Sequence, residues 1–187
     1  MPHPTAVRIT DAALEVLGTG GIHALSHARV DATAGLPPGS TSNYFRTRAT
    51  LVDGAVERLR HLDGEAFAMR LAAGFPGEMS ELIRAYADFV DDATGESRVR
   101  TAARHVIFAQ GVVQPSLLEQ LNADRRLLVD WTAGALTSLG VPRAEHIAPL
   151  LLAGIEGLLL HRLSAFTSGP AHPDVHRLIT SLAQETT

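Results

Sequence analysis

Apolar residues recur along this chain at intervals of three and four positions, and they almost never alternate with polar residues. This spacing gathers apolar side chains on one face of an α-helix, whereas alternation would indicate a β-strand. We therefore predict an all-α fold of about nine helices. Glycine and proline mark the expected helix ends, which places the helices at about residues 5–17, 26–34, 38–44, 49–73, 77–93, 96–112, 115–139, 147–166 and 173–184.

Three short helices precede the first long one, and the residues between them are of the types that end and begin helices. Ser26 is a good N-cap for the second helix, and Gly35 supplies the positive φ that a tight inter-helix turn needs. Pro38 is tolerated in a first helical turn and is expected to begin the third helix. No flexible linker follows, which predicts a small N-terminal module held rigidly through the fourth helix.

The composition narrows the classes of protein that this chain can be. The 187 residues are 45% hydrophobic and include no cysteine, which excludes a disulfide framework, a cysteine-ligated zinc site and a thiol nucleophile. The formal net charge is −4, and arginine supplies all the basic charge because the chain has no lysine. Binding to nucleic acid would therefore depend on a local arginine patch.

No segment is expected to enter a membrane or to direct secretion. Charged residues interrupt the apolar positions of the first helix, which is unlike a signal peptide. The most apolar stretch, residues 147–160, is about 14 residues long and contains Pro149 and Glu156, so we expect it to be too short and too polar for a span. With the absence of cysteine, these features predict a cytoplasmic protein.

The segment LSHARVDATAGLPPGSTSNYFRTRATL, residues 25–51, is the most informative part of the sequence. Two short helices around a glycine turn predict a helix-turn-helix, whose second helix enters the major groove of DNA. With the residues before it, the segment resembles the N-terminal signature of the TetR family of repressors over about the first 55 residues, whereas beyond these only helix count and order agree. The matching residues are Ala12, Ala13, Gly21, Ala24, Leu25, Ser26, Val30, Ala34, Gly35, Gly39, Ser40, Tyr44, Phe45, Arg48 and Leu51.

The resemblance implies a DNA-binding domain over residues 1–48 and an effector-binding and dimerisation domain over residues 49–187. It also implies a repressor that binds a palindromic double-stranded DNA operator as a dimer and is released by a small molecule. Arginine suits phosphate, Asn43 could pair with an adenine edge, and the Thr41 methyl could touch thymine. The expected DNA-binding residues are Ser26, Arg29, Pro38, Gly39, Ser40, Thr41, Ser42, Asn43, Tyr44, Arg46 and Arg48.

Three residues depart from the family pattern. Ser42 stands where the family usually has tyrosine, and Pro37 stands where it has a serine or threonine that caps the third helix. Asp31 replaces an alanine and, if exposed, would add negative charge near DNA. Before residue 50 the charge balance is only about +1, so we expect dimerisation to supply much of the affinity. The residues counted are Arg8, Arg29, Arg46 and Arg48 against Asp11, Glu15 and Asp31.

Aromatic and polar side chains within the later helices are candidates for an effector site, although each aromatic could equally be core. Their low charge indicates a largely apolar or weakly acidic effector, whose carboxylate Arg104 could bind. We expect no cofactor and no metal. The candidates are Phe67, Tyr86, Phe89, Arg104, His105, Phe108, Gln110, Trp131 and His161.

The eighth helix is apolar nearly all round, and the ninth offers Leu178, Ile179 and Leu182. Such a surface needs a partner, and the small residues Ala153, Gly154 and Gly157 would let another helix approach closely. We predict a symmetric homodimer through a four-helix interface of helices eight and nine. The alternative is that the eighth helix is the buried central helix of a monomer.

Other classes of protein are less consistent with the sequence. It contains no G-x-S-x-G, no H-E-x-x-H and no phosphate-binding glycine loop, which argues against an enzyme. His172 and His176 could share a metal, but no third ligand is evident, and Glu156 could be an acid of raised pKa or a paired residue. The remaining alternative is a helical small-molecule-binding protein without DNA-binding activity.

Overall fold

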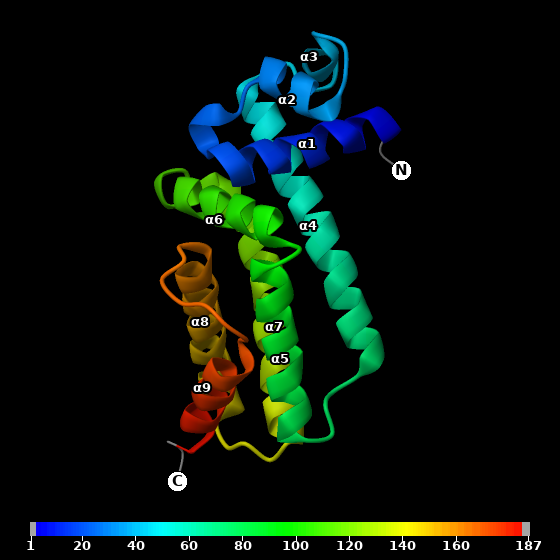
Figure 1. The fold of residues 1–187 in the computed structure, drawn as a ribbon. Coiled ribbons are helices and arrows are strands. Elements are labelled where there is room, and N and C mark those ends of the chain that lie inside the picture. The colour runs from blue at the N-terminus through cyan, green and yellow to red at the C-terminus, as the bar shows by residue number, and fades with distance from the viewer. Residues whose placement is uncertain (1–2, 185–187) are drawn as a thin grey trace. The chain divides into compact units, whose positions relative to one another are not determined.

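The structure is a computed structural model and describes residues 3–184. Within those residues the fold contains nine α-helices, two short 3₁₀-helices and no strand, which confirms the all-α prediction (Figure 1). The helices are α1 (Pro4–Gly20), α2 (His27–Ala34), α3 (Ser40–Tyr44), α4 (Arg48–Ala73), α5 (Met79–Thr94), α6 (Arg98–Val113), α7 (Glu119–Ser138), α8 (Ala144–Leu163) and α9 (His172–Gln184), with η1 (Ile22–Ala24) and η2 (Pro115–Leu118) between them.

At Pro38 and Pro115 the expected helix start lies before the observed one. The third helix begins at Ser40 rather than Pro38, because Gly39 has a φ of 89°, which a right-handed helix cannot include. Pro115 opens the 3₁₀-helix η2 instead of α7, which starts at Glu119. At both places proline lies in the turn that precedes the helix.

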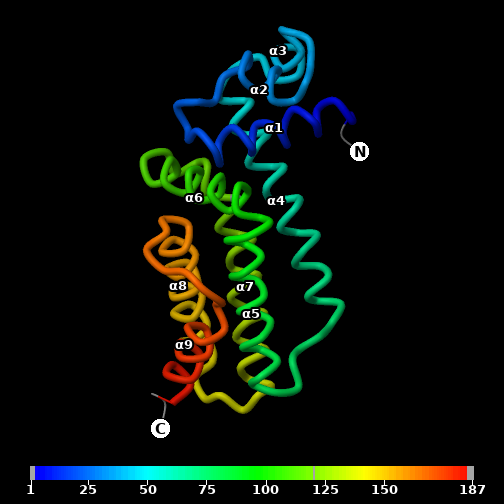
Figure 2. The backbone as a smooth tube through the Cα atoms, in the orientation of Figure 1, coloured from blue at the N-terminus to red at the C-terminus, as the bar shows by residue number. Residues whose placement is uncertain are grey.

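The chain forms two compact units. The first unit contains the residues up to Ala66 together with Arg98–Asn122, and the second contains Phe67–Ser97 together with the residues from Ala123 on. This division differs from the boundary expected after residue 48, because α6 packs against α1 and so joins the first unit. The helix α4 is unbroken from Arg48 to Ala73, so a single helix runs through both units (Figure 2).

The first unit has a core of aliphatic side chains from α1, α4 and α6. Ile9 and Leu17 of α1 are fully buried with Leu59 of α4 and Ile107 of α6. The α1–α6 contact is very close at Gly18, where an added Cβ would lie 2.1 Å from the carbonyl oxygen of Val99. The core therefore joins the helix-turn-helix region to α6.

The second unit is built around α8, which packs against α5 and α9. Its inner face, including Leu151, Ile155 and Leu159, is buried, whereas Leu150 and Leu160 are 60% and 53% exposed. The helix has 20 residues, and by length and composition it could cross a membrane, which corrects the expectation that the stretch is too short. Of the most apolar stretch of this helix, 33% is buried within the structure.

Two large apolar residues at the ends of helical apolar patterns are exposed. Met69, near the end of α4, is 71% exposed. Phe166 is 76% exposed because α8 ends at Leu163, three residues before it. The apolar spacing therefore continues beyond the part of the chain that is packed, and its last residues are exposed.

Candidate nucleic-acid interface and effector site

Helices α2 and α3 form the expected helix-turn-helix, and local hydrogen bonds define its turn. The hydroxyl of Ser26 caps α2 by accepting a hydrogen bond from the amide of Arg29 at 3.3 Å. Gly35 ends α2 in the left-handed conformation, with φ 61° and ψ 39°, a geometry that glycine adopts without steric cost. The sequence therefore predicted both ends of α2 from the residue types alone.

The start of α3 is held by Asp31, a residue of α2 that reaches across the turn. Its Oδ2 accepts a hydrogen bond from the amide of Gly39 at 2.8 Å. Its Oδ1 accepts from the amide and the hydroxyl of Thr41, at 2.7 and 2.5 Å. Gly39 cannot cap α3 with a side chain, so Asp31 provides the cap that Pro37 cannot supply.

The environment of Asp31 keeps its carboxylate charged. Burial raises its pKa, but hydrogen bonds from Thr41 and Gly39 and the nearby charge of His27 outweigh burial and hold the pKa below its ordinary value of 3.8. Only 3% of the residue is exposed. The condition under which Asp31 would add negative charge near DNA, exposure of its side chain, is therefore not met, because the carboxylate is buried within the motif.

The same contacts correct the role expected of Thr41. Its side chain is fully buried, and its hydroxyl donates to Asp31. In this conformation its methyl group cannot reach a thymine in the groove. Thr41 therefore fixes the recognition helix and is not one of its exposed side chains.

The other candidate residues of α3 and its turn lie at the surface. Asn43 is exposed, and its side-chain amide has no hydrogen-bond partner within the described residues. Ser40 and Ser42 use their hydroxyls to donate to the backbone carbonyls of Pro37 and Gly39, at 2.6 and 2.8 Å. Pro38 and Gly39 are also exposed, in the turn before α3. Asn43 is therefore the α3 residue with the most freedom to bind a base edge.

Two aromatic residues and two histidines support the end of α3. Tyr44 is partly exposed, and its hydroxyl lies 3.1 Å from Nδ1 of His3 at the start of α1. Nε2 of His27 lies 2.6 Å from the carbonyl oxygen of Phe45, which ties α2 to the residue that ends α3. Phe45 itself packs against the core of the first unit. Sequence reasoning did not identify His27 or His3, because their partners are distant in sequence.

The arginines of the motif divide into anchored and free residues. Arg48 donates from Nε to the carbonyl oxygen of Leu25 at 3.2 Å and from Nη2 to that of Ile22, so it joins the start of α4 to the loop before α2. Arg29 and Arg46 are exposed and have no ion-pair partner among the described residues. Arg29 and Arg46 are therefore the arginines with the greatest freedom to meet phosphate.

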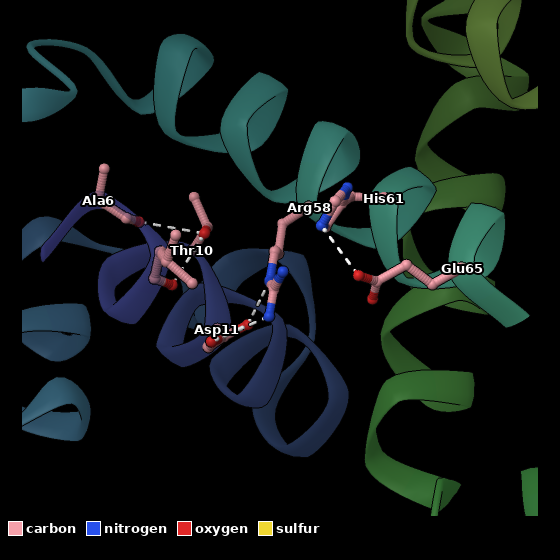
Figure 3. Close-up of polar contacts among 7 residues, drawn as sticks. Ala6, Thr10, Asp11, Arg58, His61 and Glu65 are labelled. Atoms are coloured by element: carbon pink, nitrogen blue, oxygen red, sulfur yellow. Dashed lines mark hydrogen bonds and ion pairs between the residues drawn. The ribbon is translucent and has the colours of Figure 1, made fainter. Parts of the chain in front are cut away.

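An ion pair with α4 neutralises Asp11, one of the acids in the charge balance of the residues before position 50. Figure 3 shows Arg58 of α4 reaching Asp11 of α1, where Nε donates to Oδ1 at 2.6 Å. On the next turn of α4, His61 lies 3.4 Å from Glu65. With Arg58 paired to Asp11, the local balance is more favourable to DNA than the sequence count of about +1 indicated.

The effector candidates fall into both units. Arg104, His105, Phe108 and Gln110 belong to α6 in the first unit, and Arg104 already forms an ion pair with Asp63. Nδ1 of His105 lies 2.9 Å from the carbonyl oxygen of Thr101. Arg104 is therefore not free to bind a carboxylate, which corrects that part of the expectation.

The second unit brings together four of the aromatic candidates. Tyr86 and Trp131 are buried in its core, with Phe67 and Phe89 packed against them. His161 is exposed at the end of α8, against Phe166, and is not part of this cluster. The sequence analysis grouped these aromatic residues as candidates but did not single out Arg70, whose guanidinium lies over three of them.

Arg70, in the last turn of α4, places its guanidinium over the aromatic cluster. Its Cζ lies 5.2 Å from the ring centre of Trp131, 5.6 Å from that of Tyr86 and 5.9 Å from that of Phe89. These distances are in the range of cation–π contacts. The signal in the sequence was an arginine within the apolar run AFAMRLAA, but periodicity alone does not show which face of the helix it occupies.

The exposed face of α8 is an apolar stripe made of Leu150, Ala153, Gly157 and Leu160. A Cβ added at Gly157 would meet no atom within 4 Å, so the helix surface is open there. Gly154, expected to face a partner, instead contacts Leu178 of α9 in the same chain, where a Cβ would lie 2.7 Å from a methyl carbon. The stripe, spaced by three and four residues, suits packing against another helix.

Comparison with known proteins finds relatives along the whole chain. Residues 77–185 match the family model described as "Tetracyclin repressor-like, C-terminal domain". The HTH-type transcriptional regulator BetI of Proteus mirabilis (strain HI4320) is 30% identical over 165 residues, which cover 87% of this chain and 81% of that protein. The family model thus covers the part of the chain in which the sequence carries no recognisable motif.

Solved structures share the fold over nearly the full length. A TetR-like transcriptional regulator from Rhodococcus sp. RHA1 has a TM-score of 0.71 at 22% identity, covering 98% of this chain and 96% of that one. The multidrug binding protein EbrR complexed with ethidium has a TM-score of 0.64 at 26% identity, covering 97% of this chain and 99% of that one. Both units therefore have counterparts in proteins of known structure.

Proposed function

The chain belongs to the TetR family of transcriptional regulators, which are DNA-binding proteins and not enzymes, and on this premise we propose that it is a repressor that binds a palindromic operator as a homodimer. The observation that carries the proposal is the α2–α3 motif, in which Asp31 fixes a short recognition helix with Asn43 on its exposed side. Contacts from arginine to phosphate would set the register, and Asn43 would read a base. We propose that it carries out this DNA-binding role in the cytoplasm.

We propose that the two recognition helices are brought together by the outer stripe of α8. A stripe of exposed leucines around open small residues is unfavourable in water and suits a symmetric partner. The exposed side of α9, with His176, Arg177 and Ser181, is polar and would form the rim of such an interface. The dimer would present two copies of α3 to successive turns of the major groove.

We propose that the effector is a largely apolar small molecule that binds at the aromatic cluster of the second unit. Tyr86, Phe89 and Trp131 offer ring faces, and EbrR, which shares this fold, is described in complexes with ethidium and with proflavin. Effector binding would shift the population toward a form whose recognition helices are misplaced for the operator. The helices α4 and α6 would carry this change, since α4 runs from the motif to the cluster.

The base-reading role of Asn43 is tested by the variant Asn43→Ala. We expect the variant to bind DNA from its own upstream region roughly tenfold or more weakly, with relaxed preference at one position of each half-site, because a bidentate amide–adenine contact contributes about 1–3 kcal/mol. Fluorescence anisotropy with a panel of substituted duplexes measures both effects. Thr137→Ala, an exposed change on α7, is the control and should leave binding unchanged.

The fold should not respond to the change at Asn43, because its side chain is exposed and unbonded among the described residues. Circular dichroism and thermal unfolding should therefore match the wild type. If Asn43→Ala binds every duplex of the panel as the wild type does, Asn43 does not read the operator. If the wild type ignores its own upstream DNA at low salt, the alternative of a ligand-binding protein without DNA activity is favoured.

A further inference from the structure

Arg70 is a cation held by aromatic rings alone. Within the described residues, no carboxylate lies within ion-pair distance of its guanidinium, and no hydrogen bond to it is formed. Trp131, Tyr86 and Phe89 contribute one ring each, from α7 and α5. The faces of such rings carry negative potential, so their convergence creates a site that is complementary to positive charge.

The rings are fixed and electrically neutral. The hydroxyl of Thr132 donates to the carbonyl oxygen of Leu128 at 2.7 Å, so the Tyr86 hydroxyl, at 2.6 Å, donates to Thr132. Burial raises the pKa of Tyr86 above its ordinary value of 10.0, which keeps the phenol protonated at neutral pH. The cluster therefore offers ring faces without an anionic partner.

Ring faces that are already covered cannot take a ligand without movement. Tyr86 is 1% exposed and Trp131 is 7% exposed, and the Phe75 ring lies 5.9 Å from that of Trp131. Arg70 is the side chain most able to leave, because it is long, half-buried and close to the exposed C-terminal end of α4. A molecule that binds these faces must take the place of the guanidinium.

We infer that Arg70 occupies this site in place of the effector, and that the effector is an apolar molecule with one positive charge, of the organic ammonium or aromatic iminium class, which displaces Arg70. This inference rests on the proposed function, since it names the class of effector for the same cluster. An anion is disfavoured because it would face the negative potential of three rings. Displacement frees the last turn of α4 from α5 and α7, and α4 continues to the DNA-binding motif.

The inference is tested by removing the resident cation. Ethidium, as a cationic probe, and 1-anilinonaphthalene-8-sulfonate, as an anionic one, are titrated separately by fluorescence into the full chain without DNA. Arg70→Ala should bind ethidium about tenfold more tightly than the wild type, because the competing group is gone. Arg84→Ala, which removes an exposed arginine of α5 in the same unit, is the matched control and should bind ethidium as the wild type does.

A second variant tests the rings without emptying the core. Phe89→Leu keeps an apolar, half-buried side chain but removes one ring face, and it should weaken ethidium binding about threefold to tenfold. The inference is overturned if Arg70→Ala binds ethidium no more tightly than Arg84→Ala does. It is also overturned if the only effect of Arg70→Ala is weaker binding of the anionic probe, because Arg70 would then be a partner of anions. Wild-type binding to upstream DNA, measured without probe, shows separately whether the proposed function itself holds.

Discussion

Replacing Asp31 with alanine is expected to abolish sequence-specific DNA binding. The change leaves three donors of the motif without their acceptor, which are the amides of Gly39 and Thr41 and the Thr41 hydroxyl. Hydrogen bonds to a charged group contribute about 1.5–3 kcal/mol each, and a helix of five residues has little stability of its own. We expect operator affinity to fall by at least about a hundredfold and the free energy of unfolding by about 3 kcal/mol.

A matched control separates the cap from the effect of charge. Asp53→Ala also removes one carboxylate from the first unit, but Asp53 is exposed on α4 and has no partner among the described residues. This variant should bind operator as well as the wild type or slightly better, because it removes negative charge. Equal affinity and equal stability of Asp31→Ala and Asp53→Ala would contradict the role assigned to Asp31.

The contribution of Asp31 to stability should also depend on pH. Its pKa is lowered in the folded protein, so the folded state favours the charged carboxylate relative to the unfolded chain. The resulting stabilisation is complete above the ordinary pKa of 3.8 and is lost as the pH falls through the lower folded value. Urea unfolding of the wild type and Asp31→Ala should therefore give a stability difference that is constant near pH 6 and narrows below about pH 4.

Placing a charge on the outer stripe of α8 should break the dimer. Gly157→Arg meets no atom of its own chain within 4 Å at the Cβ position, so the subunit should fold as before. In the proposed interface, however, the side chain would lie between two apolar helices, where an unpaired charge is strongly unfavourable. Loss of the second recognition helix should weaken binding to a full operator by about 10²–10⁴-fold, while affinity for a single half-site changes little.

The structure offers a matched control for this variant. Gly64 also lies in a helix with open space around an added Cβ, so Gly64→Arg adds the same charge on α4. Light scattering at micromolar concentration should show a monomer for Gly157→Arg and a dimer for Gly64→Arg. A dimer in both cases, with wild-type operator affinity, would place the interface elsewhere, whereas a monomeric wild type would make α8 the central helix of a monomer.

The helices and the ends of α2 could be predicted from the sequence because their causes are local. Ser26 caps the residues directly after it, and Gly35 needs only its own freedom to adopt positive φ. The cap of α3 is not local and could not be predicted in this way, because Asp31 lies eight and ten residues from the groups that it binds. Without coordinates, that carboxylate could be described only as an extra negative charge.

The candidate effector site shows a similar limit. The aromatic residues could be selected by their type, but Arg70 and Arg104 look alike in sequence, as arginines among apolar positions of a helix. Only their tertiary partners separate them, because Asp63 neutralises Arg104 whereas three rings surround Arg70. The apolar character of α8 likewise could not show which glycine contacts α9 and which is open.

The central claim is that α3 reads duplex DNA and that a symmetric dimer presents it twice. Selection of bound fragments from the genomic DNA of the source organism, followed by sequencing, tests both parts at once. We expect an enriched inverted repeat whose half-site centres lie about 10–10.5 base pairs apart or a multiple of this spacing. Enrichment of a single asymmetric motif, or no enrichment above input, would contradict the account.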